Sequence, residues 1–579
     1  MTDEDDFRIR PGNGRSRGSG SVKPLSLAAQ VKRAAARAGR ARRSTRRGGG
    51  TGRLGRGRVA ALAGRRSAMS RRVVIKARVV RHAGPRFTSA PLGRHIAYLE
   101  RDGITRDGRD ASMFDAQSDQ ASGDAFAGRC ADDRHHFRFI VSPEDGGELA
   151  DLKAFTRELM DDVSKDLGSR LDWVAVDHWN TDNPHVHILV RGVADDGADL
   201  VIDRDYISHG MRDRAEARAT LELGPRSERE IGQALGREVE ADRWTGLDRG
   251  LRARIGEDGM VDLRPEPGAT PDRRDLLLTG RARKLERLGI ATPAGPARWI
   301  LKPDIEARLR ELGDRGDIIK TMHRAMRDTG HALDGGRLAI HPSGETGPVI
   351  GRLVARGHHD ELAGTAYAIV DGIDGRHHHL RLRDLESTSD AAPGAIVELR
   401  TWQDRGGAPR SALAVRSDLP IGEQVTARGA TWLDRKLLAR DFAPANQGFG
   451  AEVRAAMAAR EEHLITEGLA SRRGGRAALA PNLIETLRAA DLREAAARIA
   501  QRTGLTPYET TPGSTIAGTY RERVTLASGR FAMIDDGLGF QLVPWRPALD
   551  RQLGASVTGT MAVGGGIDWT VGRSRGLGI

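Results

Sequence analysis

The clearest pattern of hydrophobic and polar positions lies in residues 171–192. Two apolar, β-rich runs flank a polar turn at 180–184, which predicts two strands joined by a short loop. Because side chains alternate between the faces of a strand, His185 and His187 are expected on the same face. His178 ends the first strand, and any register that pairs it with either of the other two places it opposite or diagonal to both. The hairpin therefore predicts three imidazoles on one face of a sheet.

Patterns on either side of this hairpin predict an N-terminal domain at 71–218. β-branched runs predict strands, and apolar residues at helical spacing predict helices. In chain order we expect a strand at 73–80, a helix at 93–101, a strand at 136–141, a helix at 151–167, the hairpin, and a helix at 206–218. This order predicts an α+β fold, with an antiparallel sheet and helices on one side of it.

Beyond residue 218 the pattern changes. We expect a charged helical region at 219–345, a small β-module at 346–420, a helical region at 421–510 and a second small β-module at 511–579. Segment 362–371 is echoed by segment 526–535, so the two β-modules are expected to be related, and a barrel is one candidate form.

The helical region between these β-modules contains a basic segment. Residues 460–476 predict either a helix followed by a basic wing, as in winged-helix DNA-binding proteins, or an ordinary helix and turn.

Charge is distributed unevenly along the chain. The net charge of the 579 residues is +13, yet residues 7–99 alone contain 25 lysine and arginine residues and no acid. We expect residues 1–70, rich in Gly, Arg, Ser and Ala, to form a basic disordered tail. A solubilising tail is one interpretation, but an acid-free run of this length favours binding to nucleic acid by counterion release. The candidate DNA contacts in the tail are Arg42, Arg43, Arg46 and Arg47.

The chain has a single cysteine, Cys130, which excludes an intramolecular disulfide and a cysteine-based zinc motif. We interpret Cys130 as structural. No apolar run approaches the roughly 18 residues of a membrane span, and the acidic start is unlike a secretory signal. These features predict a cytoplasmic protein without stable membrane insertion.

The three histidines of the hairpin have the chemistry of a metal site. Imidazole is a common ligand of divalent metals, and three protein ligands with an open position are typical of a catalytic site. We therefore expect His178, His185 and His187 to bind one divalent ion, although hydrogen-bonding histidines near strand ends are the alternative. Nitrogen donors bind Mn, Zn, Ni or Co in preference to Mg. The high cellular abundance of Mg can override this preference.

A metal beside a DNA-binding tail suggests phosphoryl transfer, which needs a nucleophile. Tyr98 and Tyr206 are the only tyrosines of the predicted N-terminal domain. Tyr98 lies on a short basic helix with Arg94 and Arg101, where cations can stabilise phosphates and contact DNA. Its position alone is equally compatible with a core residue beside Leu99.

Three segments of this domain resemble the ordered motifs of the tyrosine relaxases, the mobilisation nucleases of bacterial conjugation within the HUH endonuclease superfamily. They are A-Y-L-E-R-D-G at 97–103, H-H-F-R-F-I-V-S-P-E-D at 135–145 and H-W-N-T-D-N-P-H-V-H at 178–187. The superfamily is named for two metal-binding histidines separated by a hydrophobic residue. The resemblance covers roughly 73–212, and the remainder resembles an uncharacterised C-terminal extension found on one subgroup of relaxases.

The resemblance implies that Tyr98 is the nucleophile and that the three histidines bind the metal. The family often has an acid two residues after the first histidine of the third motif, where this chain has Asn180. Asp182 is therefore our candidate for the carboxylate that accepts the tyrosine proton or orients a histidine. Asp177 ranks lower, because strand parity points it away from the histidines. His136 is either a phosphate contact or a solvated strand end.

The implied activity is that of a relaxase. Such an enzyme nicks one strand of single-stranded or supercoiled DNA at an origin of transfer, forms a 5′-phosphotyrosine, and later reseals the strand. The implied partners are relaxosome accessory proteins and the coupling protein of a type IV secretion system, and the protein can pass with the DNA into the recipient cell. The rival hypotheses are a rolling-circle replication initiator or transposase of the same chemistry, and a non-catalytic DNA-binding architectural protein.

Overall fold

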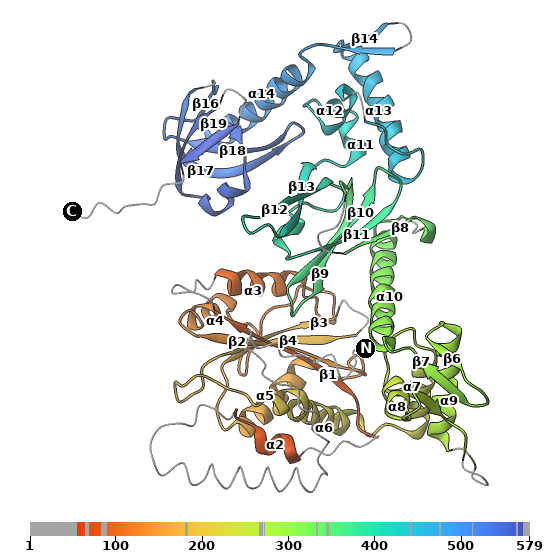
Figure 1. The fold of residues 1–579 in the computed structure, drawn as a ribbon. Coiled ribbons are helices and arrows are strands. Elements are labelled where there is room, and N and C mark those ends of the chain that lie inside the picture. Colours follow the sequence, from red (N-terminus) through yellow and green to blue (C-terminus); the bar gives the residue numbers. More distant parts are fainter. Residues whose placement is uncertain are drawn as a thin grey trace. The chain divides into compact units, whose positions relative to one another are not determined.

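The protein is described by a computed structural model in which the chain divides into two compact units, Met1–Gly316 and Asp317–Ile579. The fold is α+β, as predicted, with an antiparallel sheet near the N-terminus followed by helices and further small sheets (Figure 1). The residues described are 55–63, 69–82, 90–179, 183–265, 270, 272–331, 334–342, 347–439, 442–473, 476–511, 513–562 and 566–570.

The first unit is organised around a four-stranded sheet. Its strands are β1 (Val73–Arg81), β2 (His135–Pro143), β3 (Trp173–His178) and β4 (His185–Arg191). They are hydrogen-bonded in the order β1-β2-β4-β3, and every neighbouring pair is antiparallel. The helices of this part are α2 (Arg58–Ala63), α3 (Ala90–Asp102), α4 (Gly123–Arg129), α5 (Leu152–Leu167), η2 (Tyr206–Gly210) and α6 (Met211–Leu223).

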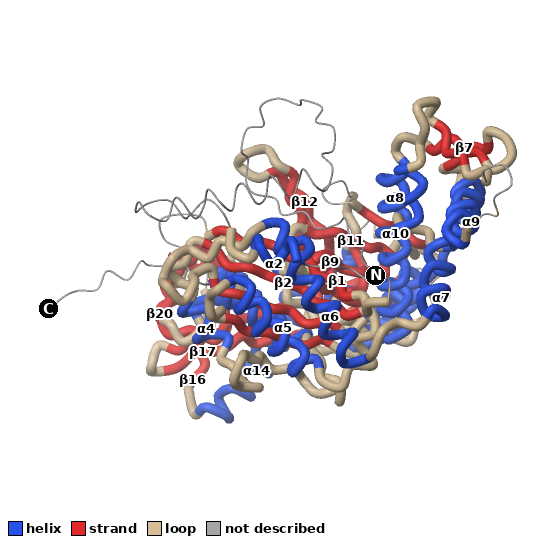
Figure 2. The backbone as a smooth tube through the Cα atoms, turned by 90° about the horizontal axis from the view of Figure 1, so that it is seen from below, coloured by secondary structure: helices blue, strands red, loops and turns tan. Residues whose placement is uncertain are grey.

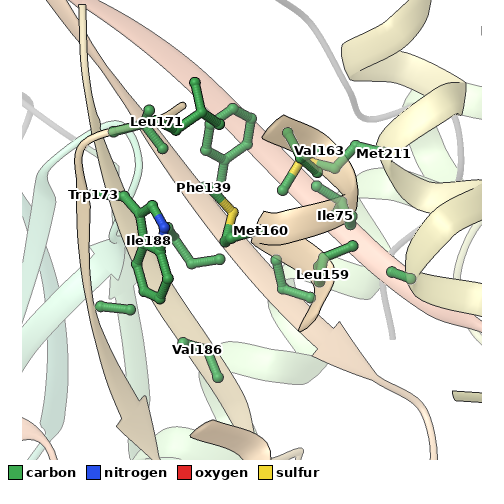
Figure 3. Packing of buried hydrophobic residues seen from close by; sticks show 14 of the residues in the cluster. Ile75, Phe139, Leu159, Met160, Val163, Leu171, Trp173, Val186, Ile188 and Met211 are labelled. Atoms are coloured by element: carbon green, nitrogen blue, oxygen red, sulfur yellow. The ribbon is translucent and has the colours of Figure 1, made fainter. Parts of the chain in front are cut away.

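Helices cover both faces of this sheet, so the expectation of helices on one side is wrong (Figure 1). Helices α5 and α6 pack on one face around a core that includes Phe139, Met160 and Ile188 (Figure 3). Helices α3 and α4 pack on the other face against Val174 and Val176. The reason is that β3 and β4 carry apolar side chains at both parities, and each apolar face must be covered.

Helix α5 follows the predicted bounds closely, and its ends have local causes. Asp151 caps its N-terminus by accepting hydrogen bonds from the backbone N–H groups of Lys153 and Ala154. Gly168 ends it in the left-handed conformation, at φ 59°, which glycine adopts without steric cost. The buried stripe of the helix is the apolar pattern that predicted it.

Helix α2 lies within the range 1–70 that was expected to be a disordered tail. Its residues Ala60 and Ala61 pack against the same core as α5, so this short segment is folded onto the first unit. Residues 1–54 lie outside the described part of the chain.

The first unit continues beyond the expected catalytic domain into three helices and a small sheet. These elements are α7 (Glu228–Glu240), α8 (Gly246–Ala253), β5 (Met260–Asp262), α9 (Arg273–Arg287), β6 (Ala291–Pro293) and β7 (Arg298–Leu301). Figure 2 shows the three helices beside one another, and the strands form a sheet in the order β5-β7-β6. Helix α10 (Ile305–Asp328) follows and contains the division between the two units.

A fully buried ion pair joins α8 to α9. Arg281 donates to both carboxylate oxygens of Asp248, at 2.7 and 2.9 Å, and neither side chain is exposed. Removing one member of such a pair leaves the other charge buried without compensation.

We expect Arg281→Met to lower the free energy of unfolding of the first unit by about 3–5 kcal/mol, because Asp248 would lose its cation. Urea-induced unfolding measures the change. Arg283→Met, two positions further on the same helix and exposed, is the control and should cost less than about 0.5 kcal/mol. Equal destabilisation by the two substitutions would contradict this account.

The second unit contains two six-stranded sheets separated by helices. The first sheet is made of β8 (Leu338–His341), β9 (Ile350–Asp360), β10 (Thr365–Gly372), β11 (His377–Leu382), β12 (Ile396–Gln403) and β13 (Pro409–Ser417). The second is made of β16 (Thr506–Tyr508), β17 (Thr515–Leu526), β18 (Gly529–Asp535), β19 (Gly539–Pro544), β20 (Ser556–Met561) and β21 (Ile567–Thr570). Between them lie α11 (Ile421–Gln424), α12 (Trp432–Leu438), α13 (Gly448–Thr466), β14 (Ala470–Arg473), β15 (Arg476–Leu479) and α14 (Leu483–Thr503).

The segments whose sequences echo one another occupy equivalent strands. The second half of segment 362–371 lies in β10, and that of segment 526–535 forms most of β18. No pairing joins the edge strands of either sheet among the described residues, so these are open sheets rather than the closed barrels that were one candidate form.

Among the described residues, no helix combines the length and the apolar character needed to cross a membrane.

Candidate metal centre

The β3–β4 hairpin has the register that the sequence predicted. His178 is directly opposite His185, and Val176 is opposite His187, which makes His178 and His187 diagonal neighbours. The imidazole centroids are 5.3 Å apart for His178 and His185, 4.6 Å for His178 and His187, and 5.0 Å for His185 and His187. All three side chains are buried, and each offers a ring nitrogen within 4.8 Å of the others.

Backbone carbonyls orient two of these rings. His185 Nδ1 lies 3.0 Å from the carbonyl oxygen of Asn183, so an N–H at Nδ1 can donate there and leave Nε2 as a lone-pair donor to a metal. His178 Nε2 lies 3.3 Å from the carbonyl oxygen of Leu99 on α3, so an N–H at Nε2 can donate there and place the lone pair of the ring on Nδ1. Such outer contacts hold a histidine in the tautomer that a metal requires.

The spacing of the ring nitrogens fits one ion. His185 Nε2 and His187 Nε2 are 3.2 Å apart. Two imidazole nitrogens bound to the same ion at about 2.1 Å lie roughly 3.0–3.4 Å apart, depending on the coordination angle. The three histidines could therefore hold a divalent metal, and their donor set is all nitrogen.

Helix α3 brings Tyr98 to the histidine face of the sheet. Tyr98 is half-buried and packs against the core formed by α3, α4, Val174 and Val176, and Val176 is the residue opposite His187. Leu99, the next residue, is fully buried and provides the carbonyl that meets His178. Tyr98 and the three histidines therefore belong to neighbouring elements on one side of the sheet.

Tyr206 lies on the opposite face. It is buried in the core under α5, and its hydroxyl donates a hydrogen bond to Asp166 at 2.8 Å. Burial, and then the contact with Asp166, raise the pKa of Tyr206 well above its usual range. The sheet separates this phenol from the three histidines.

Of the two candidate carboxylates, only Asp177 can be described. Asp177 is opposite Val186, a residue of the α5-side core, so it points away from the histidines as strand parity predicted. Its Oδ2 accepts a hydrogen bond from Trp179 Nε1 at 2.8 Å. Asp182 lies outside the described residues.

The candidate DNA contacts are only partly described. Arg94 and Arg101 lie on α3 with Tyr98, but their side chains are outside the described part of the structure. Arg42, Arg43, Arg46 and Arg47 also lie outside the described residues.

His136 is neither a phosphate contact nor a solvated strand end. It is buried, with Nδ1 2.8 Å from His82 Nε2, and its Nε2 accepts a hydrogen bond from Arg138. Burial, reinforced by Arg138 and His82, lowers the pKa of His136 to about 2, so the ring is neutral. Cys130 is fully buried in the α3–α4 core, where burial raises its thiol pKa to about 12, in agreement with a structural role.

Sequence reasoning missed the carbonyls that orient the histidine rings and the cations on the same face of the sheet. The carbonyls of Asn183 and Leu99 carry no sequence signal, because every residue has one. The cations could have been found by strand parity. Arg78 is directly opposite Arg138, and Lys76 is opposite Ile140, which is itself opposite His187. These basic residues therefore share the histidine face of the sheet.

Comparison with known proteins identifies only the C-terminal part of the chain. A family model described as "Protein of unknown function (DUF3363)" matches residues 278–408 and 403–578. No curated protein and no solved structure matches the chain.

Proposed function

Because the chain belongs to the DUF3363 family, whose function is unknown, we propose its function from the site itself: the protein is a DNA relaxase that nicks one strand by tyrosine transesterification. The observation that supports this most strongly is the convergence of three histidines on the sheet face against which the helix of Tyr98 packs. A nucleophile-bearing helix beside a nitrogen-donor metal site is the constellation that metal-assisted phosphodiester exchange requires.

Each part has a role in the proposed reaction. A divalent ion held by His178, His185 and His187 would offset the negative charge on the oxygens of the scissile phosphate. Tyr98 Oη attacks the phosphorus, the bond to the 3′-oxygen breaks, and the 3′-hydroxyl leaves with a proton. The phenol gives up its own proton, for which Asp182 is our candidate acceptor. The product is a 5′-phosphotyrosine, and its phosphodiester linkage conserves the energy of the bond that was broken. The reverse attack by a 3′-hydroxyl can therefore reseal the strand without ATP.

The face beside the histidines is suited to a polyanion. Lys76, Arg78 and Arg138 share that face, and burial together with the neighbouring Arg78 lowers the pKa of Arg138 to about 10. A group of cations on one face attracts a polyanion. We propose that backbone phosphates of the DNA strand bind here, with the basic N-terminal tail adding counterion release.

The proposed setting is conjugative transfer. The substrate is single-stranded or supercoiled DNA at an origin of transfer, in the bacterial cytoplasm, and the covalent complex would pass to a recipient through a secretion coupling protein. Relaxosome accessory proteins are the expected partners.

The proposal can be tested by incubating the protein, with and without divalent metal, with a supercoiled plasmid. This plasmid carries the origin of transfer of the genetic element that encodes the protein. We expect a metal-dependent nick on one strand at one position, with protein covalently attached to the 5′ end. Binding without nicking would contradict the proposal and favour an architectural DNA-binding protein. A nick at a replication origin or at transposon ends would support the same tyrosine transesterification, but it would assign the protein to replication initiation or transposition instead of conjugation.

A further inference from the structure

Two stretches of the chain repeat the same elements in the same order. The sequence pattern G-x-x-V-x-A-x-x-x-T-x-L-D-R occurs at 236–249 and again at 422–435. In both, the threonine and the aspartate form a capping box at the start of a helix, α8 in the first copy and α12 in the second. The two segments therefore share a local structure as well as a pattern.

The same buried ion pair follows in each copy. Arg460 on α13 binds Asp434 as Arg281 on α9 binds Asp248, and all four side chains are fully buried. The remaining donors of each guanidinium bind three carbonyls at corresponding positions, those of Val239, Ala241 and Arg243 in the first copy and those of Val425, Ala427 and Gly429 in the second. Independent origin of two such matching sets is implausible.

The correspondence continues to the end of each copy. Helices α9 and α13 each lead into a hairpin, β6–β7 or β14–β15, and then into a long helix and a six-stranded sheet. The sheets have matching strand orders and directions, with one parallel edge pair in each. The chain therefore contains two tandem copies of one module, at about 236–417 and about 422–570. Each copy begins with short helices, a longer helix and a hairpin, which is the element order of a winged helix-turn-helix.

The two copies differ in the charge of the exposed stripe on the longer helix. When Arg281 is aligned with Arg460, the stripe residues Arg273, Arg283 and Arg287 of α9 correspond to Glu452, Glu462 and Thr466 of α13. Arg283 is exposed and has no hydrogen-bond or ion-pair partner among the described residues.

The other two arginines of the stripe are also available to a ligand. Arg273 and Arg287 have side chains 61% exposed, and among the described residues each is paired with one glutamate of α7 that is itself more than half exposed. Such surface pairs are weak and exchange readily for a phosphate. The hairpin after α9 adds Lys302, which is exposed and follows β7 directly.

We infer that the first copy of this module binds duplex DNA, with α9 and the β6–β7 hairpin against the DNA and with Arg273, Arg283 and Arg287 contacting phosphates. The longer helix of a helix-turn-helix lies in the major groove, where a row of arginines meets the flanking backbones. The second copy has the same scaffold, but Glu452, Glu462 and Thr466 replace the arginines of this stripe on its longer helix. The inference concerns duplex DNA and does not depend on the proposed nicking of a single strand.

Two variants of the full-length chain with the same change of net charge test the inference. Arg273→Glu with Arg283→Glu introduces the residues of the second copy into the first. The control, Arg454→Glu with Arg493→Glu, alters exposed arginines on α13 and α14 of the second copy. Fluorescence anisotropy with a labelled random-sequence duplex over a series of salt concentrations gives the affinities. The basic N-terminal tail is common to all the proteins, so its contribution cancels in the comparison.

We expect the α9 variant to bind duplex DNA at least about tenfold more weakly, with the slope of log K against log salt reduced by about 2. The control should stay within about twofold of the parent. Equal losses in the two variants, or no loss in either, would overturn the inference. Hydrogen exchange of residues 273–287 provides a second measurement on the unaltered chain: protection by duplex DNA supports the inference, and its absence opposes it. Single-strand nicking is measured separately, so either proposal can fail alone.

Discussion

Tyr98→Phe is expected to abolish both strand nicking and the covalent adduct, because the substitution removes only the oxygen that would attack the phosphate. Loss of a covalent nucleophile typically costs more than about 10⁴-fold in rate. The packing of α3 should be unaffected, since the phenyl ring retains the contacts that Tyr98 makes with the core. The assay uses an oligonucleotide spanning the nick site and labelled on its 3′ side, with denaturing electrophoresis to detect protein attached to the labelled fragment.

Tyr206→Phe is the matched control for this experiment. It removes a hydroxyl that donates to Asp166 on the far side of the sheet, which should cost about 1 kcal/mol in the free energy of unfolding. The adduct should form as in the parent chain. An adduct that persists in Tyr98→Phe and disappears in Tyr206→Phe would mean that the nucleophile has been misidentified.

His185→Ala is expected to weaken the binding of a divalent metal at least about 100-fold, because it removes one of three nitrogen donors, a larger loss than that of an outer-sphere contact. His185 is the most informative ligand, since its ring is oriented by the Asn183 carbonyl and its Nε2 lies 3.2 Å from His187 Nε2. Isothermal titration of the metal-free chain with Mn²⁺ or Zn²⁺ measures the affinity. The parent should also gain thermal stability on adding metal, and the variant should not.

His135→Ala provides a histidine control in the same sheet. His135 Nε2 lies 2.9 Å from the carbonyl oxygen of Leu200, and the ring packs edge-on against Phe137. His135 is not part of the cluster formed by His178, His185 and His187. Its removal should leave the metal affinity unchanged. If both variants bind metal as the parent does, the three histidines form a hydrogen-bonded cluster and the metal-assisted mechanism fails.

The two apolar runs and the polar turn of residues 171–192 were sufficient to predict the histidine cluster. A β-strand has a side-chain period of two, so His185 and His187 must share a face, and a short turn leaves few registers for His178. Helix α5 was equally readable, because its apolar stripe and its Asp151 and Gly168 caps are all local signals. Local spacing determines which side chains leave an element together.

Contacts between distant segments were decided only by the tertiary structure. Tyr98 and Tyr206 were equivalent candidates in the sequence, and packing assigned them to opposite faces of the sheet. Nothing in the sequence indicated that Arg281 and Arg460 are buried, because both lie on helices that carry many charged residues. Their burial depends on carboxylates and carbonyls more than 25 residues away, which bind the guanidinium groups. From the sequence we predicted the duplication only from an echo between two strands, although the pattern shared by 236–249 and 422–435 was also present in it.

The sequence by itself determined the α+β class, the faces of the strands and the three imidazoles, because these depend on the periodicity of neighbouring residues. Only the tertiary structure decided which tyrosine meets the histidine face, which carbonyls orient the rings and how far the repeat extends. These features depend on which elements pack together, and no spacing along the chain encodes that.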